Sequence, residues 1–364
     1  MKKYLFSALA SGLILSAQSA SAVEFEVTEL TNGLKHPWGI AFLPDGSALI
    51  TERTGGLRHM KPDGVLSEPI SGLPEAVTKG QGGMLGLAVH PNFAETNEVY
   101  VCLSVAGEGG QSSEVHKGTL EGGQLTNVSR VFQALPKVDS AFHFGCRVTF
   151  DKKGDVFISL GDRGSFKERS QETDAHFGKV VRVTQDGQAV ADNPFINGPA
   201  PEIYSYGHRN VQGMTMHPET GEIWTHEHGP KGGDEINILS KGDNYGWPSI
   251  TYGVNYNGSI ITDETEMDGM RQPLIYWDPS IAPSGMTFYN GDAFEQWQGD
   301  LFIGSLKFRY LKHLEMDGDK VVSQRNLLED LDYRIRDVVQ GPDGNLYVIT
   351  DAANGKVLKI HPTK

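Results

Sequence analysis

The stretch Gly154-Asp-Val-Phe157-Ile-Ser159 is one of six similar segments that decide the fold of this chain. In each segment a turn residue precedes a run of β-branched, aliphatic or aromatic residues, which is typical of a tight turn entering a β-strand. The six central residues lie 45 to 78 positions apart, a spacing that suits four-stranded blades carrying long loops. The repeat therefore predicts an all-β fold, namely a six-bladed β-propeller with four-stranded blades. The central residues are Leu49, Tyr100, Phe157, Trp224, Phe302 and Tyr347.

Length and composition indicate one domain. The chain has 364 residues, yet it contains no linker, charge block or low-complexity segment at which it divides, so we expect a single propeller domain over residues 23–364. Its 44 glycines and its few segments with helical periodicity agree with an all-β domain. The formal net charge of −14 makes nucleic acid and anionic membrane surfaces unfavourable partners.

Residues 1–22 have the pattern of a signal peptide. Lys2 and Lys3 precede an apolar stretch too short to span a bilayer, and Ala20-Ser21-Ala22 forms a small-residue cleavage site. We therefore expect cleavage after Ala22 and a periplasmic or secreted bacterial protein. No later stretch is long and apolar enough for a membrane helix, so membrane insertion is not expected.

Cys102 and Cys146 are the only cysteines. Export permits a disulfide, but two thiols in neighbouring blades also fit two buried, inert side chains, and the sequence leaves both alternatives open. The cysteines have no metal-ligand spacing.

Polar residues between glycines mark the functional loops, because glycine lets a ligand approach the backbone closely. In this acidic protein, four cations at corresponding places in different blades predict an anionic ligand at the mouth of the propeller. The loops are residues 79–84, 142–147, 206–213 and 228–237, and the cations are Arg209, Lys307, Arg334 and Arg336.

Three of these motifs, in this order, resemble the soluble pyrroloquinoline quinone (PQQ)-dependent aldose sugar dehydrogenases of the glucose/sorbosone dehydrogenase family, six-bladed propellers that bind calcium. The likeness covers nearly all of the chain after residue 22, from His36-Pro37-Trp38-Gly39 to Asp343-Gly344-Asn345-Leu346-Tyr347. The three motifs are the segment around His143, Gly207-His208-Arg209-Asn210 with Gln212-Gly213, and Gly229-Pro230 with Asp234-Glu235-Ile236-Asn237.

The resemblance implies a set of binding residues. The carbonyls of Gly229 and Pro230 match calcium ligands beside the cofactor, and Glu235 with the Tyr245 carbonyl matches a second, structural calcium position. The side chains that match cofactor contacts are Gln81, Arg209, Asn210, Tyr256, Lys307, Arg334 and Arg336.

The resemblance also implies the reaction. His143 is the candidate general base: it accepts the proton of the sugar C1 hydroxyl while a hydride leaves C1 for the quinone, which yields a lactone. The partners are then an aldose substrate and an external electron acceptor that the sequence does not identify, and the protein is a monomer or a homodimer.

Several of these residues also have a structural interpretation. His143 between two phenylalanines fits a packed histidine, and Arg334 with Arg336 fits cations bonded to a carboxylate such as Asp332. His226-Glu227-His228 does not have the spacing of a helical zinc motif, so we do not expect zinc there. Asp317-Gly318-Asp319 is expected to be a hairpin turn rather than a calcium loop, because no Glu stands at the twelfth position.

Three departures from the glucose-oxidising members bear on specificity. Phe142 stands where those members have an acid, Cys146 stands where they have glycine, and Trp277 lies one place before their substrate-stacking tryptophan. We therefore do not expect glucose selectivity. Two rival functions are a calcium-dependent sugar lactonase-type hydrolase, which needs several carboxylates around a central ion, and a non-catalytic binding propeller.

Overall fold

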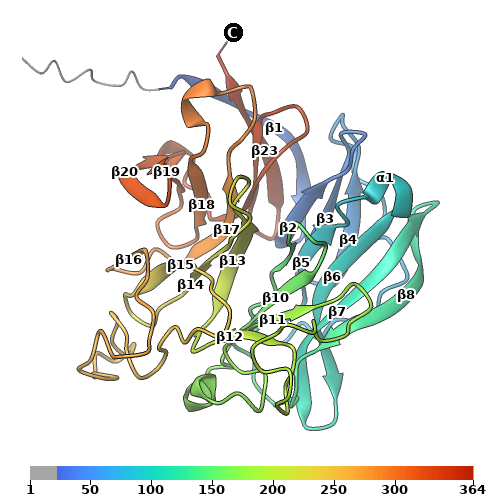
Figure 1. The fold of residues 1–364 in the computed structure, drawn as a ribbon. Coiled ribbons are helices and arrows are strands. Elements are labelled where there is room, and N and C mark those ends of the chain that lie inside the picture. Colours follow the sequence, from blue (N-terminus) through green and yellow to red (C-terminus); the bar gives the residue numbers. More distant parts are fainter. Residues whose placement is uncertain (1–22, 364) are drawn as a thin grey trace, which may run out of the picture.

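The computed structural model describes residues 23–363 and confirms a six-bladed β-propeller, with six antiparallel sheets arranged around one axis (Figure 1). The innermost strands of neighbouring blades contact one another in a closed ring. It runs β2 (Pro37–Phe42), β5 (Met84–Val89), β9 (Val148–Phe150), β13 (Val211–Met216), β17 (Pro283–Phe288), β21 (Ile335–Gln340) and back to β2. The predicted signal peptide, residues 1–22, lies outside the described residues. No helix in the described range has the length and apolarity needed to cross a membrane.

Blades 1 to 3 follow one another along the chain, each starting at the axis and moving outward. Blade 1 consists of β2 (Pro37–Phe42), β3 (Ala48–Glu52) and β4 (Gly56–Met60). Blade 2 consists of β5 (Met84–Val89), β6 (Glu98–Gly107), β7 (Gly110–Glu121) and β8 (Gln124–Gln133). Blade 3 consists of β9 (Val148–Phe150), β10 (Val156–Leu160), β11 (Lys179–Val183) and β12 (Ile203–Tyr206).

Blades 4 to 6 continue in the same order. Blade 4 consists of β13 (Val211–Met216), β14 (Ile223–Glu227), β15 (Asp234–Ile238) and β16 (Ile275–Trp277). Blade 5 consists of β17 (Pro283–Phe288), β18 (Leu301–Ser305), β19 (Leu311–Asp317) and β20 (Lys320–Leu327). Blade 6 consists of β21 (Ile335–Gln340), β22 (Leu346–Thr350), β23 (Gly355–Pro362) and β1 (Phe25–Leu34). The short helices are α1 (Phe93–Thr96), η1 (Lys167–Gln171), η2 (Glu295–Trp297) and η3 (Glu329–Leu331).

The two ends of the chain close the ring. β1, near the N-terminus, pairs antiparallel with β23, near the C-terminus, from Phe25 opposite Pro362 to Leu34 opposite Gly355 (Figure 1). This pairing supplies the fourth strand of blade 6, so its outer position is filled from the opposite end of the sequence. Closure of the ring protects the unpaired edge strands, which in an open stack of sheets could pair with other chains and aggregate.

Each repeated segment of the sequence forms the second strand of a blade, as the pattern predicts. Phe157, for example, lies in β10, where its ring is 2% exposed and packs against the sheet of blade 4. The turn before it needs a positive φ, which Gly154 provides at 86°, while the Asp151 carboxylate accepts the backbone N–H of Asp155. Trp224 and Phe302 are likewise fully buried between blades.

Blade 1 differs from the other five, because it has three strands and a single bridge between Met60 and Leu66 at its outer edge. The segment that follows β4 contains Pro62, Pro69 and Pro74. Proline has no backbone N–H to donate, so a full outer ladder cannot form there.

Cys102 and Cys146 form a disulfide, with their Cα atoms 5.6 Å apart. The disulfide joins β6 of blade 2 to the loop that precedes β9 of blade 3. The sequence left open whether the two cysteines are bonded or are free buried thiols, and the structure shows that they are bonded. Gly318 and Asp319 form the turn between β19 and β20, which confirms the predicted hairpin.

Candidate active site

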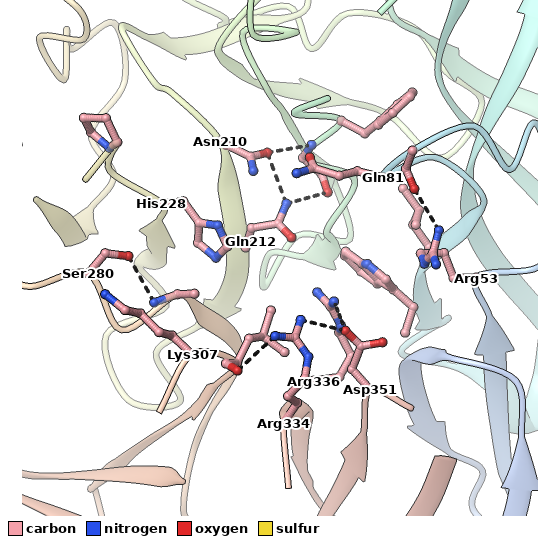
Figure 2. A pocket seen from close by; sticks show the side chains of 18 of the residues that line it. Arg53, Gln81, Asn210, Gln212, His228, Ser280, Lys307, Arg334, Arg336 and Asp351 are labelled. Atoms are coloured by element: carbon pink, nitrogen blue, oxygen red, sulfur yellow. Dashed lines mark hydrogen bonds and ion pairs between the residues drawn. The ribbon is translucent and has the colours of Figure 1, made fainter. Parts of the chain in front are cut away.

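A cavity of about 810 Å³ lies on the propeller axis, at the end where the innermost strands begin and the second strands finish (Figure 2). All six blades contribute to its wall, so no single blade contains the site. Of the twelve predicted site residues, seven line this cavity: Gln81, Asn210, Pro230, Tyr256, Lys307, Arg334 and Arg336. The other five are not part of its lining: His143, Arg209, Gly229, Glu235 and Tyr245.

Arg334 and Arg336 flank the start of β21 and share one carboxylate (Figure 2). Their Nη2 atoms lie 3.0 and 2.7 Å from Oδ2 of Asp351, which follows β22. Burial opposes ionisation of Asp351, but Arg336, His36 and Arg334 outweigh it and hold the pKa of this carboxyl well below its usual range. The sequence suggested Asp332 as the partner, but that carboxylate pairs with Arg309 instead.

The wall contains more positive charge than the four predicted cations supply. Arg53 lines it while donating from Nη1 to the Gly80 carbonyl at 2.9 Å, and Lys231 lines it next to Pro230. Asp351 is the one carboxylate among the lining residues of the described cavity. The electrostatic character of the site is therefore cationic, in a protein whose overall charge is negative.

His143 is held at its backbone and at its ring. Its N–H donates to Oε1 of Gln81 at 2.8 Å, which places it directly behind the cavity wall. Its Nδ1 lies 2.6 Å from Oδ1 of Asp162, and Oδ2 of that carboxylate accepts the indole N–H of Trp247 at 2.8 Å. Because an ionised carboxylate only accepts, the proton of the neutral imidazole is on Nδ1 and Nε2 carries the free lone pair.

Burial favours the neutral form of His143. Burial lowers the pKa of the imidazole below its usual value, Arg209 and Arg163 lower it further, and Asp162 opposes them. Arg209 lies with its guanidinium 5.3 Å from the ring centre of Trp247 and donates to the His228 carbonyl at 2.9 Å. Arg209 therefore contacts the neighbours of the cavity rather than its interior.

His228 is a second neutral imidazole, and it lines the cavity (Figure 2). Its Nε2 lies 2.7 Å from the Pro283 carbonyl and donates to it. Burial, with smaller contributions from Arg209, Arg336 and His143, lowers the pKa of His228 to about 3. Nearby, His226 is engaged by the Gly285 carbonyl at 3.1 Å, so both histidines of this segment bond to backbone oxygens.

The carbonyls of Gly229 and Pro230 belong to a loop that Asp234 fixes. Oδ1 of Asp234 accepts the Gly229 N–H at 2.9 Å, and its Oδ2 accepts the N–H of Ile281 at 2.7 Å. Within residues 23–363, neither carbonyl oxygen accepts a hydrogen bond from the protein. Free carbonyl oxygens on a rigid loop are the hard ligands that calcium prefers, so this pair fits a calcium site.

Glu235 lies opposite Glu227 in the ladder between β15 and β14. Burial, reinforced by the nearby Glu227 carboxylate, raises the pKa of Glu235 to about 8. A partly buried carboxylate that forms no salt bridge with the described residues fits a bound cation. Tyr245 stacks on His208 with ring centres 4.7 Å apart. No group of three or more His, Cys, Asp or Glu residues in the described range is arranged to hold a metal, so a cation here would depend on backbone or water oxygens.

Two further predicted residues, Asn210 and Tyr256, differ in their exposure to solvent. Asn210 is 3% exposed, and its Oδ1 accepts the Gly145 N–H and the Gln212 side-chain amide at 3.2 and 3.1 Å. Tyr256 is 73% exposed and lies in the turn of residues 255–259, at the rim. Its ring is therefore available to a ligand that enters the cavity.

Comparison with known proteins agrees with this arrangement. A family model described as Glucose / Sorbosone dehydrogenase matches residues 34–359. The chain belongs to this family. It is 44% identical over 355 residues to the aldose sugar dehydrogenase YliI of Escherichia coli strain K12, a match that covers 95% of each chain.

Two solved structures of family members are similar over the whole propeller. The apo form of the soluble aldose sugar dehydrogenase from Escherichia coli has a TM-score of 0.90 at 44% identity, covering 93% of this chain and 100% of that one. The PQQ-bound aldose sugar dehydrogenase of Streptomyces coelicolor has a TM-score of 0.76 at 26% identity, covering 94% and 100%. The resemblance seen in the sequence is thus confirmed at the level of the family.

Four functional residues were not predicted from the sequence: Asp162 as the partner of His143, Trp247 as the partner of Asp162, and Arg53 and Asp351 as charged residues of the wall. Asp162 stands in Gly161-Asp162-Arg163-Gly164, directly after a predicted strand. Polar residues between glycines at a strand end mark the other functional loops, and this segment has the same pattern. Asp351 also follows a predicted strand, but nothing in its local sequence indicates an arginine partner.

Proposed function

We propose that this protein is a periplasmic quinoprotein that oxidises the C1 hydroxyl of aldose sugars to lactones with PQQ and calcium. The observation that carries the proposal is the convergence of Lys307, Arg334 and Arg336 on one axial cavity, next to the paired His143 and Asp162. The family membership of the chain and the PQQ-bound relative support the same function.

The cations of the wall suit this cofactor, because PQQ carries three carboxylates. Planar guanidinium groups bind carboxylates in a bidentate manner, and the ammonium of Lys307 adds a point charge. Arg334 and Arg336 are already oriented by Asp351, so they lose little freedom when a ligand binds. We expect Gln81, Asn210 and Tyr256 to add hydrogen bonds or stacking, and Arg209 to contribute charge from behind the wall.

The carbonyls of Gly229 and Pro230 would hold a calcium ion beside the cofactor, and Glu235 with the Tyr245 carbonyl would hold a second, structural one. The first ion would supply Lewis-acid chemistry next to the quinone. When bound, PQQ supplies the electrophilic carbon that accepts the hydride from C1 of the sugar. An external acceptor would take up the two electrons of the reduced cofactor.

His143 performs the proton transfer. Its Nε2 lone pair accepts the proton of the C1 hydroxyl, while Nδ1–H remains bonded to Asp162, which stabilises the imidazolium that forms. Loss of that proton and of the hydride from C1 leaves a carbonyl at C1, and in a cyclic sugar this product is a lactone. The neutral state of His143 at the start is favoured by burial and by the two nearby arginines.

The hydrolase alternative has less support. A lactonase of the propeller type surrounds its ion with several side-chain carboxylates, whereas the described cavity wall contains one, Asp351, and two arginines occupy it. The binding-propeller alternative does not account for the His143–Asp162 pair.

Titration of purified apoprotein with PQQ and calcium tests the proposal. We expect PQQ absorbance changes, a raised melting temperature and aldose-dependent dye reduction, with all three dependent on both additions. An apoprotein whose melting temperature and aldose oxidation do not respond to the quinone and calcium would disprove the dehydrogenase function. Lactone hydrolysis without the quinone would support the hydrolase instead.

A further inference from the structure

Arg163 reaches from the end of β10 into the loop that carries His143. Its Nη1 donates to the Phe142 carbonyl at 2.7 Å, and its Nη2 donates to the Ser140 carbonyl at 2.6 Å. In the opposite direction, Oγ of Ser140 donates to the Arg163 carbonyl at 2.6 Å. The guanidinium also lies 3.6 Å from the ring centre of Phe144. Arg163 thus contacts this loop on both sides of His143.

The peptide group between Phe142 and His143 is fixed at both ends. Its carbonyl accepts Arg163 Nη1, and its N–H donates to Gln81 Oε1 at 2.8 Å. Arg163 is 5% exposed, so its hydrogen bonds are shielded from water and are strong for their kind. Asp162, the preceding residue, holds the imidazole ring. Adjacent residues of one loop therefore fix the backbone and the ring of the same histidine.

This loop needs external support because its backbone is in a costly conformation. His143 has a φ of 50° and Cys146 has a φ of 77°, both in the left-handed region that non-glycine residues avoid. A residue in this conformation is costly and persists only where its surroundings determine it. The bonds from Arg163 to the carbonyls of Ser140 and Phe142 are contacts that hold the segment in this conformation.

We propose that Arg163 is a positioning residue for the reaction: it fixes the loop of residues 140–144 so that Nε2 of His143 meets the C1 hydroxyl of the sugar. The inference rests on the proposed function, since it takes His143 as the base. Arg163 itself touches neither substrate nor cofactor in this role, and the guanidinium acts through the backbone that it holds.

The charge of Arg163 gives the proposal a second readout. The charged and titratable groups that face His143 are Asp162, Arg163, Arg209 and His228. Burial lowers the pKa of Arg163 to about 10, so the guanidinium remains charged at neutral pH. Together with Arg209 it disfavours the imidazolium, and its removal should therefore raise the pKa of His143.

The test compares Arg163→Met, Arg163→Lys and Arg58→Met with the wild-type holoenzyme and apoprotein. Lysine keeps the charge but not the planar fork that spans two carbonyls. Arg58 is the matched control: it is a largely buried arginine of blade 1 whose Nε donates to the Ser67 carbonyl at 2.6 Å, and it does not line the cavity. We measure kcat with an aldose and a dye, the PQQ dissociation constant, the melting temperature, and the NMR titration of His143 in the apoprotein.

For Arg163→Met we expect kcat to fall about 10- to 100-fold, PQQ affinity to stay within about threefold, and the pKa of His143 to rise. For Arg163→Lys we expect a pKa close to that of the wild type with kcat still reduced, which separates geometry from charge. Arg58→Met should lose thermal stability but keep kcat.

Wild-type turnover in Arg163→Met, or reduced turnover with unchanged His143 resonances and pKa, would overturn the inference. If the methionine variant does not fold, the lysine variant decides, and an unchanged kcat there would also overturn it. Should His143→Ala keep its turnover, the proposed base is wrong. The NMR titration in the apoprotein still reports separately whether Arg163 fixes the loop.

Discussion

The imidazole of His143 and the carboxylate of Asp162 are 2.6 Å apart, although the two residues belong to different loops. The carboxylate is almost completely buried, and its second oxygen is fixed by the indole of Trp247. This arrangement sets the tautomer of the imidazole, leaves Nε2 free, and stabilises the charge that appears when a proton is taken up.

Asp162→Asn should lower kcat by about two to four orders of magnitude, because an amide can stabilise the wrong tautomer and no longer balances the imidazolium. Since the carboxylate raises the pKa of His143, its loss should also move the acid limb of the kcat profile to lower pH. Trp247→Phe, which removes one bond to Asp162, should have a smaller effect on kcat. An asparagine variant with the wild-type pH profile would contradict the assigned interaction.

The wild-type pH dependence follows from the same groups. The pKa of His143 is lowered, and the base acts in its neutral form, so kcat/KM should rise with pH and level off below the ordinary histidine pKa of about 6.5. Steady-state kinetics from pH 4.5 to 8 in buffers of constant ionic strength would measure this. An acid limb centred above 7 would show that the imidazolium is favoured in the site, against the structure.

His143→Ala should lower kcat by about two to four orders of magnitude while the PQQ dissociation constant stays nearly unchanged. The matched control is His361→Ala, a histidine of β23 whose Nε2 lies 2.9 Å from Oγ1 of Thr28 and which does not line the cavity. We expect that variant to keep the wild-type kcat. Near-normal turnover in His143→Ala would place the base elsewhere.

Much of this architecture could be predicted from the sequence, because the second strand of every blade repeats the same turn and the same apolar run. The convergence of Lys307, Arg334 and Arg336 was also predictable, since each lies where an innermost strand begins or a second strand ends. The pairing of β1 with β23 was not, because it joins the two ends of the chain and depends on no local pattern.

The contacts that orient the site could not be predicted for a similar reason. Asp162 reaches His143 from another loop, and Asp351 reaches Arg336 from the next strand, so side-chain direction decides both contacts. Asp234 is held in the same way by distant groups: it is buried, and its carboxylate accepts the backbone N–H groups of Gly229, Ile281 and Ala282.

Arg336→Met should weaken PQQ binding by about 10- to 100-fold, because it removes a charge-assisted contact worth roughly 1.5 to 3 kcal/mol. The control is Arg309→Met, which breaks a surface ion pair with Asp332 and should leave the affinity unchanged. Equilibrium titration of the two apoproteins, each with calcium present, would measure the difference. Equal affinities would exclude Arg336 from the cofactor site.

Glu235→Gln should reduce the rise in melting temperature that calcium produces, because the amide removes the charge of a proposed ligand. In the absence of calcium, the same change should stabilise the apoprotein, since it removes a carboxylate that is paired in the ladder with the buried carboxylate of Glu227. Thermal unfolding with calcium and with a chelator would test both effects. A calcium response equal to that of the wild type would exclude Glu235 as a ligand.

The substrate range should be broad. Trp277 is 9% exposed and its indole N–H donates to Gln324, so it is part of the fold and does not stack on a sugar. Phe142, 55% exposed beside His143, offers no hydrogen bond to a distal hydroxyl. A site discriminates strongly only when the wrong substrate leaves its buried polar groups unpaired.

We therefore expect several aldoses, including pentoses and disaccharides, to have kcat/KM values within about a hundredfold of one another. Dye-coupled assays over a panel of aldoses would measure them, and a preference of several orders of magnitude for one sugar would reveal side chains that close around its distal hydroxyls.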